Sequence, residues 1–305
     1  MRLPRFLRLG DEVALIAPAC PEPPERLEKA VESVRGFGLK PRLFPSCTAR
    51  HGYFAGTDAG RARDLAEAFA SPEIKAVICM RGGYGAQRLL AYADFDAIAA
   101  SGKPLYGYSD VTALHMELNR RGVISWHTPM PGTEWYAGLD GFTRDSVRAA
   151  LFGPMPVKLA NPENAGAIKC VNPGKAEGVL FGGNLSLVAS SLGTFYAPDA
   201  KGKILFLEDV DEYPYRIDRM LLQLRNAGVF DGCAGVAFGA FTDCNPKDPD
   251  NTLTIDEIIG ELLGDIKKPV VTGLQCGHIL PTLCLPLGAR VLLDADSAEL
   301  RILEP

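Results

Sequence analysis

The chain has 305 residues, of which 47% are hydrophobic and 23% are charged. These fractions are ordinary for a globular protein and exclude an intrinsically disordered chain. There are 37 acidic and 32 basic residues, so the net charge is −5. This balance argues against partners such as nucleic acid or an anionic membrane. At roughly 150 residues per domain, the length predicts about two domains.

The N-terminal segment has the outline of a signal peptide, because three arginines precede the apolar stretch 13–17: Arg2, Arg5 and Arg8. However, Asp11 and Glu12 lie where the apolar region should begin, and the stretch is short. No apolar run approaches the roughly 18 residues that a membrane span needs. We therefore expect residues 12–17 to form the first strand of a cytoplasmic domain.

The chain has eight cysteines, and none forms a Cys-x-x-Cys pair. A zinc or redox site therefore lacks its usual spacing. Several cysteines lie within apolar runs, as Cys79 does, so we expect free buried thiols in a reducing compartment. We predict neither a metal nor a cofactor.

The first half of the chain alternates short apolar runs with segments of helical periodicity. Strands are predicted at 12–17, 42–44, 76–80, 104–106 and 123–126. Helices are predicted around 27–34, from about 58 onward, through 89–90, and at 110–121. This alternation is typical of βαβ units and a parallel sheet.

Residues 153–174 change in character, because they are rich in Pro, Asn and Gly and have little periodicity. We interpret 154–173 as a linker between an N-terminal domain, 1–153, and a C-terminal domain, 174–305. In the second domain, strands are predicted near 179 and at 204–207, 236–238, 270–272, 290–294 and 299–303. Helices are predicted at 185–192, 215–227 and 255–263.

The most distinctive local feature is the segment 105–112, where a strand leads through Gly107 to Ser109 and directly into a helix. Such a sharp turn exposes the serine hydroxyl and leaves backbone N–H groups free to bind an oxyanion, with Asp110 N–H as one donor. The alternative is that Ser109 is only a helix N-cap.

A second feature is the glycine-rich segment 80–86, which follows a predicted buried strand and precedes a helix. Three interpretations stay open: a phosphate or dinucleotide cradle, a loop that donates an N–H group to an oxyanion, or a tight turn. The cradle pattern is incomplete, because Arg88 stands where the third glycine belongs.

A serine nucleophile needs a base and a carboxylate that orients it. Of the four histidines, His278 is the best candidate, because it follows an apolar strand and lies among glycines. His127 is second, His115 lies mid-helix and is expected to be structural, and His51 lies in a polar loop.

For the carboxylate we choose Glu208, because four apolar residues lead directly into it. The acidic run that begins with Glu208 has two alternative interpretations, a solvated turn or a calcium-binding loop, but it lacks the twelve-residue EF-hand pattern.

Together these segments resemble the LD-carboxypeptidase family of serine peptidases. The resemblance covers nearly the whole chain and lies in the order of six motifs: 10–18, 81–85, 107–112, 180–186, 207–209 with 215–218, and 277–278 with 285–288. The sequence departs from the family at His127-Thr128-Pro129, where many members carry His-Gly-Pro. Trp126 and Trp135 flank this segment. Two interpretations are open for this pair, an apolar wall or core packing, and we favour core packing.

The resemblance implies a Rossmann-like α/β nucleophile domain followed by a smaller, strand-rich α/β domain that supplies Glu and His. It implies a catalytic triad of Ser109, Glu208 and His278, in agreement with the residues chosen above. Gly83 and Asp110 would then be the oxyanion donors through their backbone N–H groups. We list Arg81, Tyr84 and Asn184, which lie within these motifs, as candidate substrate contacts.

The activity implied is cleavage of the amide between an L-centre and a terminal D-residue, with release of D-alanine from a muropeptide tetrapeptide in cytoplasmic peptidoglycan recycling. The resemblance also implies a homodimer. A related branch hydrolyses microcin C-type peptide-nucleotides, and both branches share the triad motifs. An alternative of another class is a non-catalytic nucleotide- or peptide-binding module built on the glycine loop.

Overall fold

The computed structural model describes residues 5–304, so the position of Arg2 lies outside the described residues. The chain divides into two compact units. Unit 1 comprises residues 1–155 with 284–286, and unit 2 comprises residues 156–283 with 287–305. The boundary at 155 lies close to the predicted one at 153.

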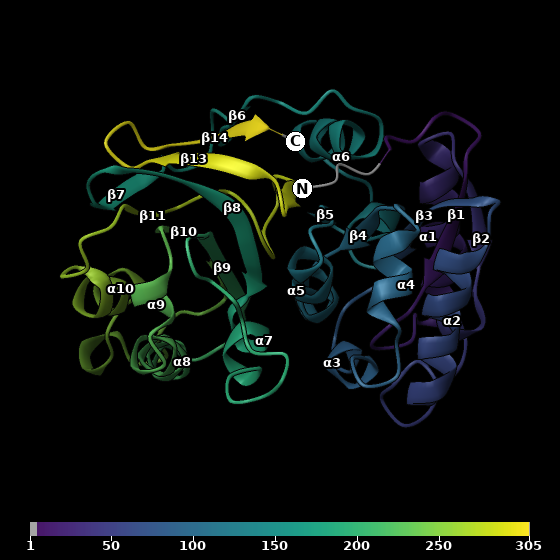
Figure 1. The fold of residues 1–305 in the computed structure, drawn as a ribbon, viewed down its shortest axis with the longest axis horizontal. Helices are drawn as coiled ribbons and strands as arrows, with labels where there is room; N and C mark the ends of the chain where they lie inside the picture. The colour runs from purple at the N-terminus through teal and green to yellow at the C-terminus, as the bar shows by residue number, and fades with distance from the viewer. Residues whose placement is uncertain (1–4, 305) are drawn as a thin grey trace. The chain divides into compact units, whose positions relative to one another are not determined.

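Unit 1 is built on a six-stranded sheet with the strand order β12-β5-β4-β3-β1-β2; strands β1 to β5 are labelled in Figure 1. The strands are β1 Glu12–Ile16, β2 Lys40–Leu43, β3 Ile74–Cys79, β4 Leu105–Gly107, β5 Ser125–His127 and β12 Leu285–Leu287. The pairs β2–β1, β1–β3, β3–β4 and β4–β5 are all parallel. The predicted parallel sheet is therefore confirmed.

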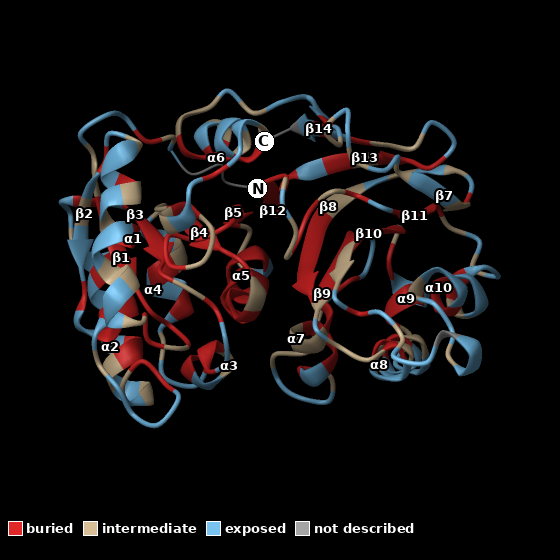
Figure 2. Cartoon of the chain, turned by 180° about the vertical axis from the view of Figure 1, so that it is seen from behind, coloured by how far each residue is buried: buried red, intermediate tan, exposed pale blue. Residues whose placement is uncertain are grey.

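Helices cover both faces of this sheet, as in a Rossmann-like domain. The helices are α1 Pro24–Gly36, α2 Asp58–Ala70, α3 Ala86–Leu89, α4 Phe95–Ala100, α5 Thr112–Arg120 and α6 Gly141–Phe152. Side chains of α1 and α6 join one face of β1 and β3 in a single apolar cluster, while α2 contacts the same two strands. Apart from the exposed edge strand β2, the strands are buried, and the helices expose their outer faces (Figure 2). Burial explains why these strands appear in the sequence as continuous apolar runs.

Unit 2 is built on an eight-stranded sheet with the order β6-β14-β13-β8-β9-β10-β11-β7. Its centre is four parallel strands, β8 Lys175–Asn184, β9 Ile204–Val210, β10 Gly235–Thr242 and β11 Val270–Thr272. The others pair antiparallel: β13 Arg290–Asp294, β14 Glu299–Glu304, β6 Lys158–Leu159 and β7 Lys169–Asn172. The helices are α7 Leu185–Ser190, α8 Pro214–Asn226, α9 Val229–Gly232 and α10 Ile255–Leu263.

The structure differs from the sequence prediction in the stretch 154–173, which was expected to be an irregular linker. Strands β6 and β7 lie within it and form the two opposite edges of the unit 2 sheet. Two to four residues between prolines, asparagines and glycines are too short to show strand periodicity. The three-residue strand β12 was not predicted because its middle residue is Pro286, and a proline within a run argues against a strand.

Both tryptophans are buried, as expected for core packing. Trp126 stacks on Tyr106 with a ring-centroid distance of 6.2 Å, and Trp135 packs on Phe37 at 4.9 Å.

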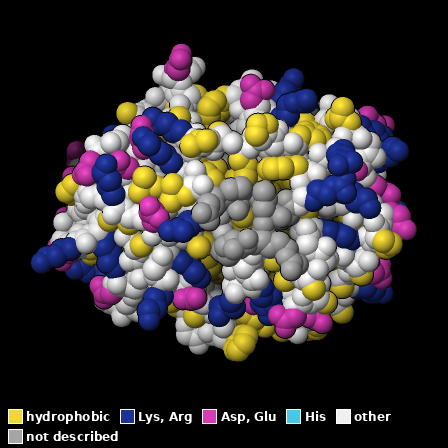
Figure 3. Space-filling model, turned by 45° about the horizontal axis from the view of Figure 1, so that its top comes forward, with side chains coloured by type: hydrophobic (Ala, Val, Ile, Leu, Met, Phe, Trp, Pro, Cys, Tyr) yellow, Lys and Arg dark blue, Asp and Glu magenta, His cyan; other side chains and the backbone are white. Residues whose placement is uncertain are grey.

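Within the described residues, no helix is both long and apolar enough to cross a bilayer. On the face drawn in Figure 3, basic and acidic side chains are interspersed.

Unit 1 also buries an acid, Glu22, in the connection from β1 to α1. It is 1% exposed, and neither carboxylate oxygen has a hydrogen-bond partner among the described residues. Burial raises the pKa of Glu22 to about 7, although the charges of Arg81 and Arg26 act in the opposite direction. When this buried carboxyl ionises at and above neutral pH, its charge therefore lowers the stability of the folded state.

Glu22→Gln should stabilise the protein at pH 8. Because the pKa of Glu22 is higher in the folded than in the unfolded state, the folded state binds more protons between about pH 4.5 and 7, and stability falls as the pH rises through this window. Thermal unfolding should show the variant above wild type by roughly 3 °C or more at pH 8 and by less at pH 5. The control is Glu28→Gln, an exposed site on α1. An increase in unfolding temperature that is equal at pH 5 and pH 8 would contradict the raised pKa of Glu22.

Candidate active site

Ser109 lies on a strained turn between β4 and α5. Residues Ser109–Val111 form a single 3₁₀ turn before the helix, and Ser109 has φ = +64°. A non-glycine residue in this region costs free energy, and such strain is common at nucleophile turns. No side-chain capping hydrogen bond occurs at the start of the turn or of α5, so the N-cap alternative for Ser109 is wrong.

The glycine loop lies directly against this turn. A Cβ atom on Gly82 would be 2.8 Å from Ser109 Cβ and 3.0 Å from Ser109 Oγ. Gly83 has φ = +114°, and a Cβ atom there would lie 2.4 Å from Cys20 Sγ. The loop therefore needs glycine both for its conformation and for its approach to the serine. The following helix, α3, has only four residues, too few for the macrodipole that a phosphate cradle uses.

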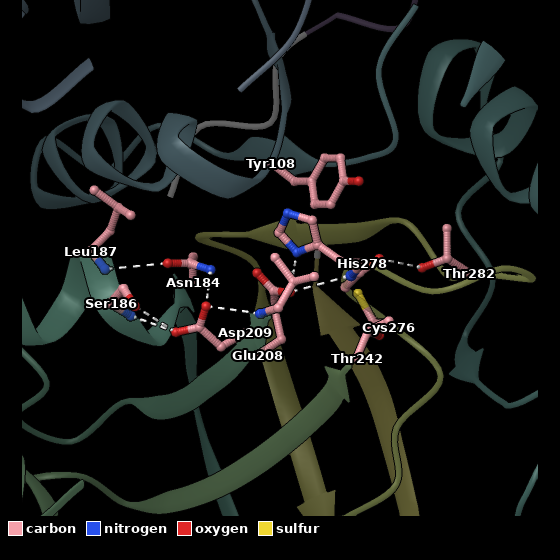
Figure 4. Close-up of polar contacts among 12 residues, drawn as sticks. Tyr108, Asn184, Ser186, Leu187, Glu208, Asp209, Thr242, Cys276, His278 and Thr282 are labelled. Atoms are coloured by element: carbon pink, nitrogen blue, oxygen red, sulfur yellow. Dashed lines mark hydrogen bonds and ion pairs between the residues drawn. The ribbon is translucent and has the colours of Figure 1, made fainter. Parts of the chain in front are cut away.

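In unit 2, Glu208 and His278 form a close pair (Figure 4). His278 Nδ1 lies 2.7 Å from Glu208 Oε2, and the His278 backbone N–H donates to the same oxygen at 3.3 Å. The Glu208 side chain has no exposed surface, whereas that of His278 is 16% exposed. An ionised carboxylate only accepts hydrogen bonds, so Nδ1 carries the proton and Nε2 is left with a lone pair that can accept one.

The backbone of the His278 loop makes this pair possible. Gly277 has φ = +118°, and a Cβ atom there would lie 2.6 Å from Glu208 Oε2. The loop is tied to β10, because Leu274 N–H donates to Phe238 O at 3.1 Å and Ala240 N–H donates to Cys276 O at 2.8 Å. The imidazole is thus presented by a loop that is fixed to the central sheet.

The other histidines have different environments. His115 is completely buried, with Nδ1 2.8 Å from Ser125 Oγ and Nε2 2.9 Å from Gly107 O. Burial lowers the pKa of His115 to about 3, so the ring is neutral. The prediction that His115 is structural is confirmed. His127 is buried at the end of β5, and His51 is exposed.

Asp209, which sequence reasoning did not single out, organises the residues around Glu208. Its carboxylate accepts hydrogen bonds from Asn184 Nδ2 at 3.0 Å and from the Ser186 backbone and hydroxyl at 2.9 and 2.8 Å (Figure 4). Asn184 Oδ1 also caps α7 by accepting from Leu187 N–H. Burial raises the pKa of Asp209, although these bonds partly oppose the effect. No group of three or more potential metal ligands occurs among the described residues.

Arg81 and Tyr84, the other candidate contacts, lie in the glycine loop of unit 1. Arg81 Nε is buried and has no hydrogen-bond partner among the described residues. The Tyr84 side chain is 49% exposed, and its ring centroid lies 6.0 Å from that of Tyr53, which is 63% exposed.

Unit 1 carries a serine on a strained strand-to-helix turn with a glycine loop against it, and unit 2 carries a His–Glu pair. These are the kinds of group that serine hydrolases use. Models of the two LD-carboxypeptidase domains match this chain, the N-terminal domain at residues 13–128 and the C-terminal domain at residues 177–293. The chain therefore belongs to the LD-carboxypeptidase family, and the resemblance seen in the sequence is confirmed.

Individual relatives agree with this assignment. The chain is 38% identical over 295 residues to a probable murein peptide carboxypeptidase of Bacillus subtilis, covering 95% of this chain and 91% of the relative. It is similar to the crystal structure of muramoyltetrapeptide carboxypeptidase from Oxalobacter formigenes, with a TM-score of 0.84, 34% identity and coverage of 95% and 97%. It is also 28% identical over 332 residues to the microcin C7 self-immunity protein MccF of Escherichia coli, covering 98% and 96%.

The strain at Ser109 can be measured with two variants. Ser109→Gly places a residue that tolerates positive φ at this turn, whereas Ser109→Ala removes the hydroxyl and keeps the strain. We expect the glycine variant to be more stable than the alanine variant by up to about 1 kcal/mol in denaturant unfolding, because glycine's greater entropy in the unfolded chain offsets part of the gain. An alanine variant of equal or greater stability would show that the strain at this turn is no larger than the entropic cost of glycine.

Gly277→Ala should separate His278 from Glu208, because the new methyl group would overlap the carboxylate. We expect the kcat for peptide hydrolysis to fall by at least roughly 10²-fold, with a smaller change in KM. The reason is that a histidine base without its orienting carboxylate stabilises the transition state less well. The matched control is Gly260→Ala, on α10 of the same unit, where a Cβ atom would meet nothing within 4 Å. Steady-state kinetics with retained kcat in Gly277→Ala would contradict the role of this contact.

Proposed function

We propose that this chain is a serine-type LD-carboxypeptidase that removes the terminal D-alanine from a murein tetrapeptide. The observation that carries the proposal is the Nδ1–Oε2 contact of 2.7 Å between His278 and the buried Glu208, in a chain of the LD-carboxypeptidase family. This contact holds the ring in the tautomer that a general base requires.

In the proposed mechanism, Ser109 Oγ attacks the carbonyl carbon of the L–D amide, and its proton passes to His278 Nε2. Glu208 stabilises the resulting imidazolium. The backbone N–H groups of Gly83 and Asp110 bind the negative oxygen of the tetrahedral intermediate. His278 then gives the proton to the leaving nitrogen, and D-alanine departs. A water molecule, deprotonated by the same ring, cleaves the acyl-enzyme and restores Ser109.

The choice of substrate is supported by the relatives that are named murein peptide and muramoyltetrapeptide carboxypeptidase. A terminal D-residue carries a carboxylate, and Arg81 is the group in the glycine loop that can bind an anion. Tyr84 offers an exposed ring in the same loop. Asn184 contributes indirectly, because its amide is bonded to Asp209 and to the start of α7.

We further propose that units 1 and 2 correspond to the nucleophile domain and to the domain that supplies Glu and His, and that the enzyme acts in the cytoplasm as a homodimer. A microcin-type amide hydrolase is the second candidate, because the chain is 28% identical to a self-immunity protein over almost its whole length. The glycine-loop nucleotide-binding module gains no support from the four-residue α3.

The function is tested by incubation with murein tetrapeptide and measurement of free D-alanine. Wild type should release it, and Ser109→Ala, Glu208→Gln and His278→Ala should each lose several powers of ten in kcat. Combining two of these changes should cost little more than one, because the residues act as a unit.

Two outcomes would count against this function. One is the absence of D-alanine release by wild type. The other is release that persists in Ser109→Ala. An aminoacyl-sulfamoyl-adenosine assayed in parallel identifies the second candidate if it is cleaved and the tetrapeptide is not. Sedimentation of the purified protein tests the homodimer.

A further inference from the structure

We propose that Asp110 and Arg61 are positioning residues that hold both oxyanion donors in a fixed relation to each other. The inference rests on the proposed function, in which Gly83 and Asp110 supply those donors. It concerns the side chains of Asp110 and Arg61, which take no part in the mechanism above. Every contact involved lies within unit 1.

Asp110 links the nucleophile turn to the glycine loop. Its backbone lies next to Ser109, while its side chain, 1% exposed, reaches the far end of the loop. There Oδ2 accepts a hydrogen bond from Ala86 N–H at 2.6 Å. One residue therefore carries one donor on its backbone and ties down the loop that carries the other.

Arg61 holds the same loop from the side of α2. It is 1% exposed, and its Nη1 donates to Gly85 O at 2.9 Å and also to Pro18 O. Nη2 pairs with Asp58, and the guanidinium carbon lies 4.9 Å from the centre of the Phe54 ring. The planar guanidinium thus connects the loop to two other segments of unit 1 through several bonds at once.

These bonds flank Gly83 on both sides. Before it, Gly82 O accepts from Cys20 N–H at 3.3 Å. After it, Gly85 O and Ala86 N–H are held by Arg61 and Asp110. With its neighbours fixed and φ at +114°, the peptide N–H of Gly83 has little freedom to turn.

The arrangement costs folding free energy, because it buries two ionisable groups. Burial raises the pKa of the Asp110 carboxyl to about 6, although the Ala86 N–H bond and the charge of Arg61 oppose the effect. Burial lowers the pKa of the Arg61 guanidinium, although Asp58 and, less strongly, Asp110 oppose it. Oxyanion stabilisation requires donors about 2.7–3.1 Å from the negative oxygen. A rigid connection between the two donors meets that requirement without reorganisation during the reaction.

The test compares Asp110→Ala, Asp110→Asn and Arg61→Lys with a control that loses a similar bond elsewhere in unit 1. Asp64, on the same helix as Arg61, is 4% exposed and accepts from Ser46 N–H at 2.6 Å, so Asp64→Ala is the matched control. Kinetics are measured with murein tetrapeptide at a temperature at which circular dichroism shows every variant folded.

We expect Asp110→Ala to lower kcat by roughly 10²–10³-fold, the usual cost of one misplaced oxyanion donor, with KM changed less than about threefold. Asp110→Asn keeps an acceptor for Ala86 N–H and should recover at least about tenfold of this loss. Arg61→Lys should lower kcat in the same way, because an ammonium does not replace the planar fork. Asp64→Ala should lower the unfolding temperature while leaving kcat within about threefold.

Equal kcat losses in Asp110→Ala and Asp64→Ala would overturn the proposal, since the effect would then be general destabilisation. So would an unchanged kcat in Asp110→Ala, an absence of rescue by asparagine, or an effect confined to KM. Failure of the proposed function itself is distinguishable, because it appears as inactive wild type or as an active Ser109→Ala variant.

Discussion

The buried hydrogen bond between Glu208 and His278 is the interaction on which the proposed chemistry depends. A carboxylate with no exposed surface is poorly solvated, so its charge must be compensated by bonds from the protein. Here the compensation comes from the imidazole Nδ1 and from the His278 backbone N–H. The same bonds that make the buried charge tolerable also fix the orientation and tautomer of the ring.

Close approach of the backbone is the second constraint, and it recurs in both units. Gly82 lies against Ser109 where no Cβ atom fits, and Gly277 lies against Glu208 in the same way. In each case a side chain would displace the group on which the chemistry depends. The glycines near the site are therefore required by packing as well as by backbone conformation.

The surrounding polar residues show how the protein supports such closely spaced groups. Asp209 is adjacent to Glu208 but bonds to Asn184 and Ser186, so its charge serves the local fold. Asp110 plays the corresponding part beside Ser109, where its carboxylate binds Ala86 N–H. In both places, a residue proposed to react is followed by an acid that bonds to a neighbouring segment: Asp209 to the end of β8 and the start of α7, and Asp110 to the start of α3. The cost of burying these acids is visible in their raised pKa values.

The parallel sheet of unit 1 and the central strands of unit 2 could be predicted from the sequence. Glu208 and His278, which were chosen separately from the sequence, lie in contact. Buried strands are continuous apolar runs, and the residues that follow them are readable as strand ends. Strands β6, β7 and β12 could not be predicted, because β6 and β7 lie in a stretch rich in Pro, Asn and Gly, β12 contains Pro286, and all three pair with partners far away in the chain. The contacts of Arg61, Asp209 and Gly277 could not be predicted either. Sequence periodicity shows which faces of helices and strands are apolar, but it does not show the partners of a single buried charge or glycine. The sequence by itself determined which groups stand at the ends of strands, because that follows from local patterns. Only the tertiary structure decided which atoms they touch, because those distances depend on how segments far apart in the chain pack.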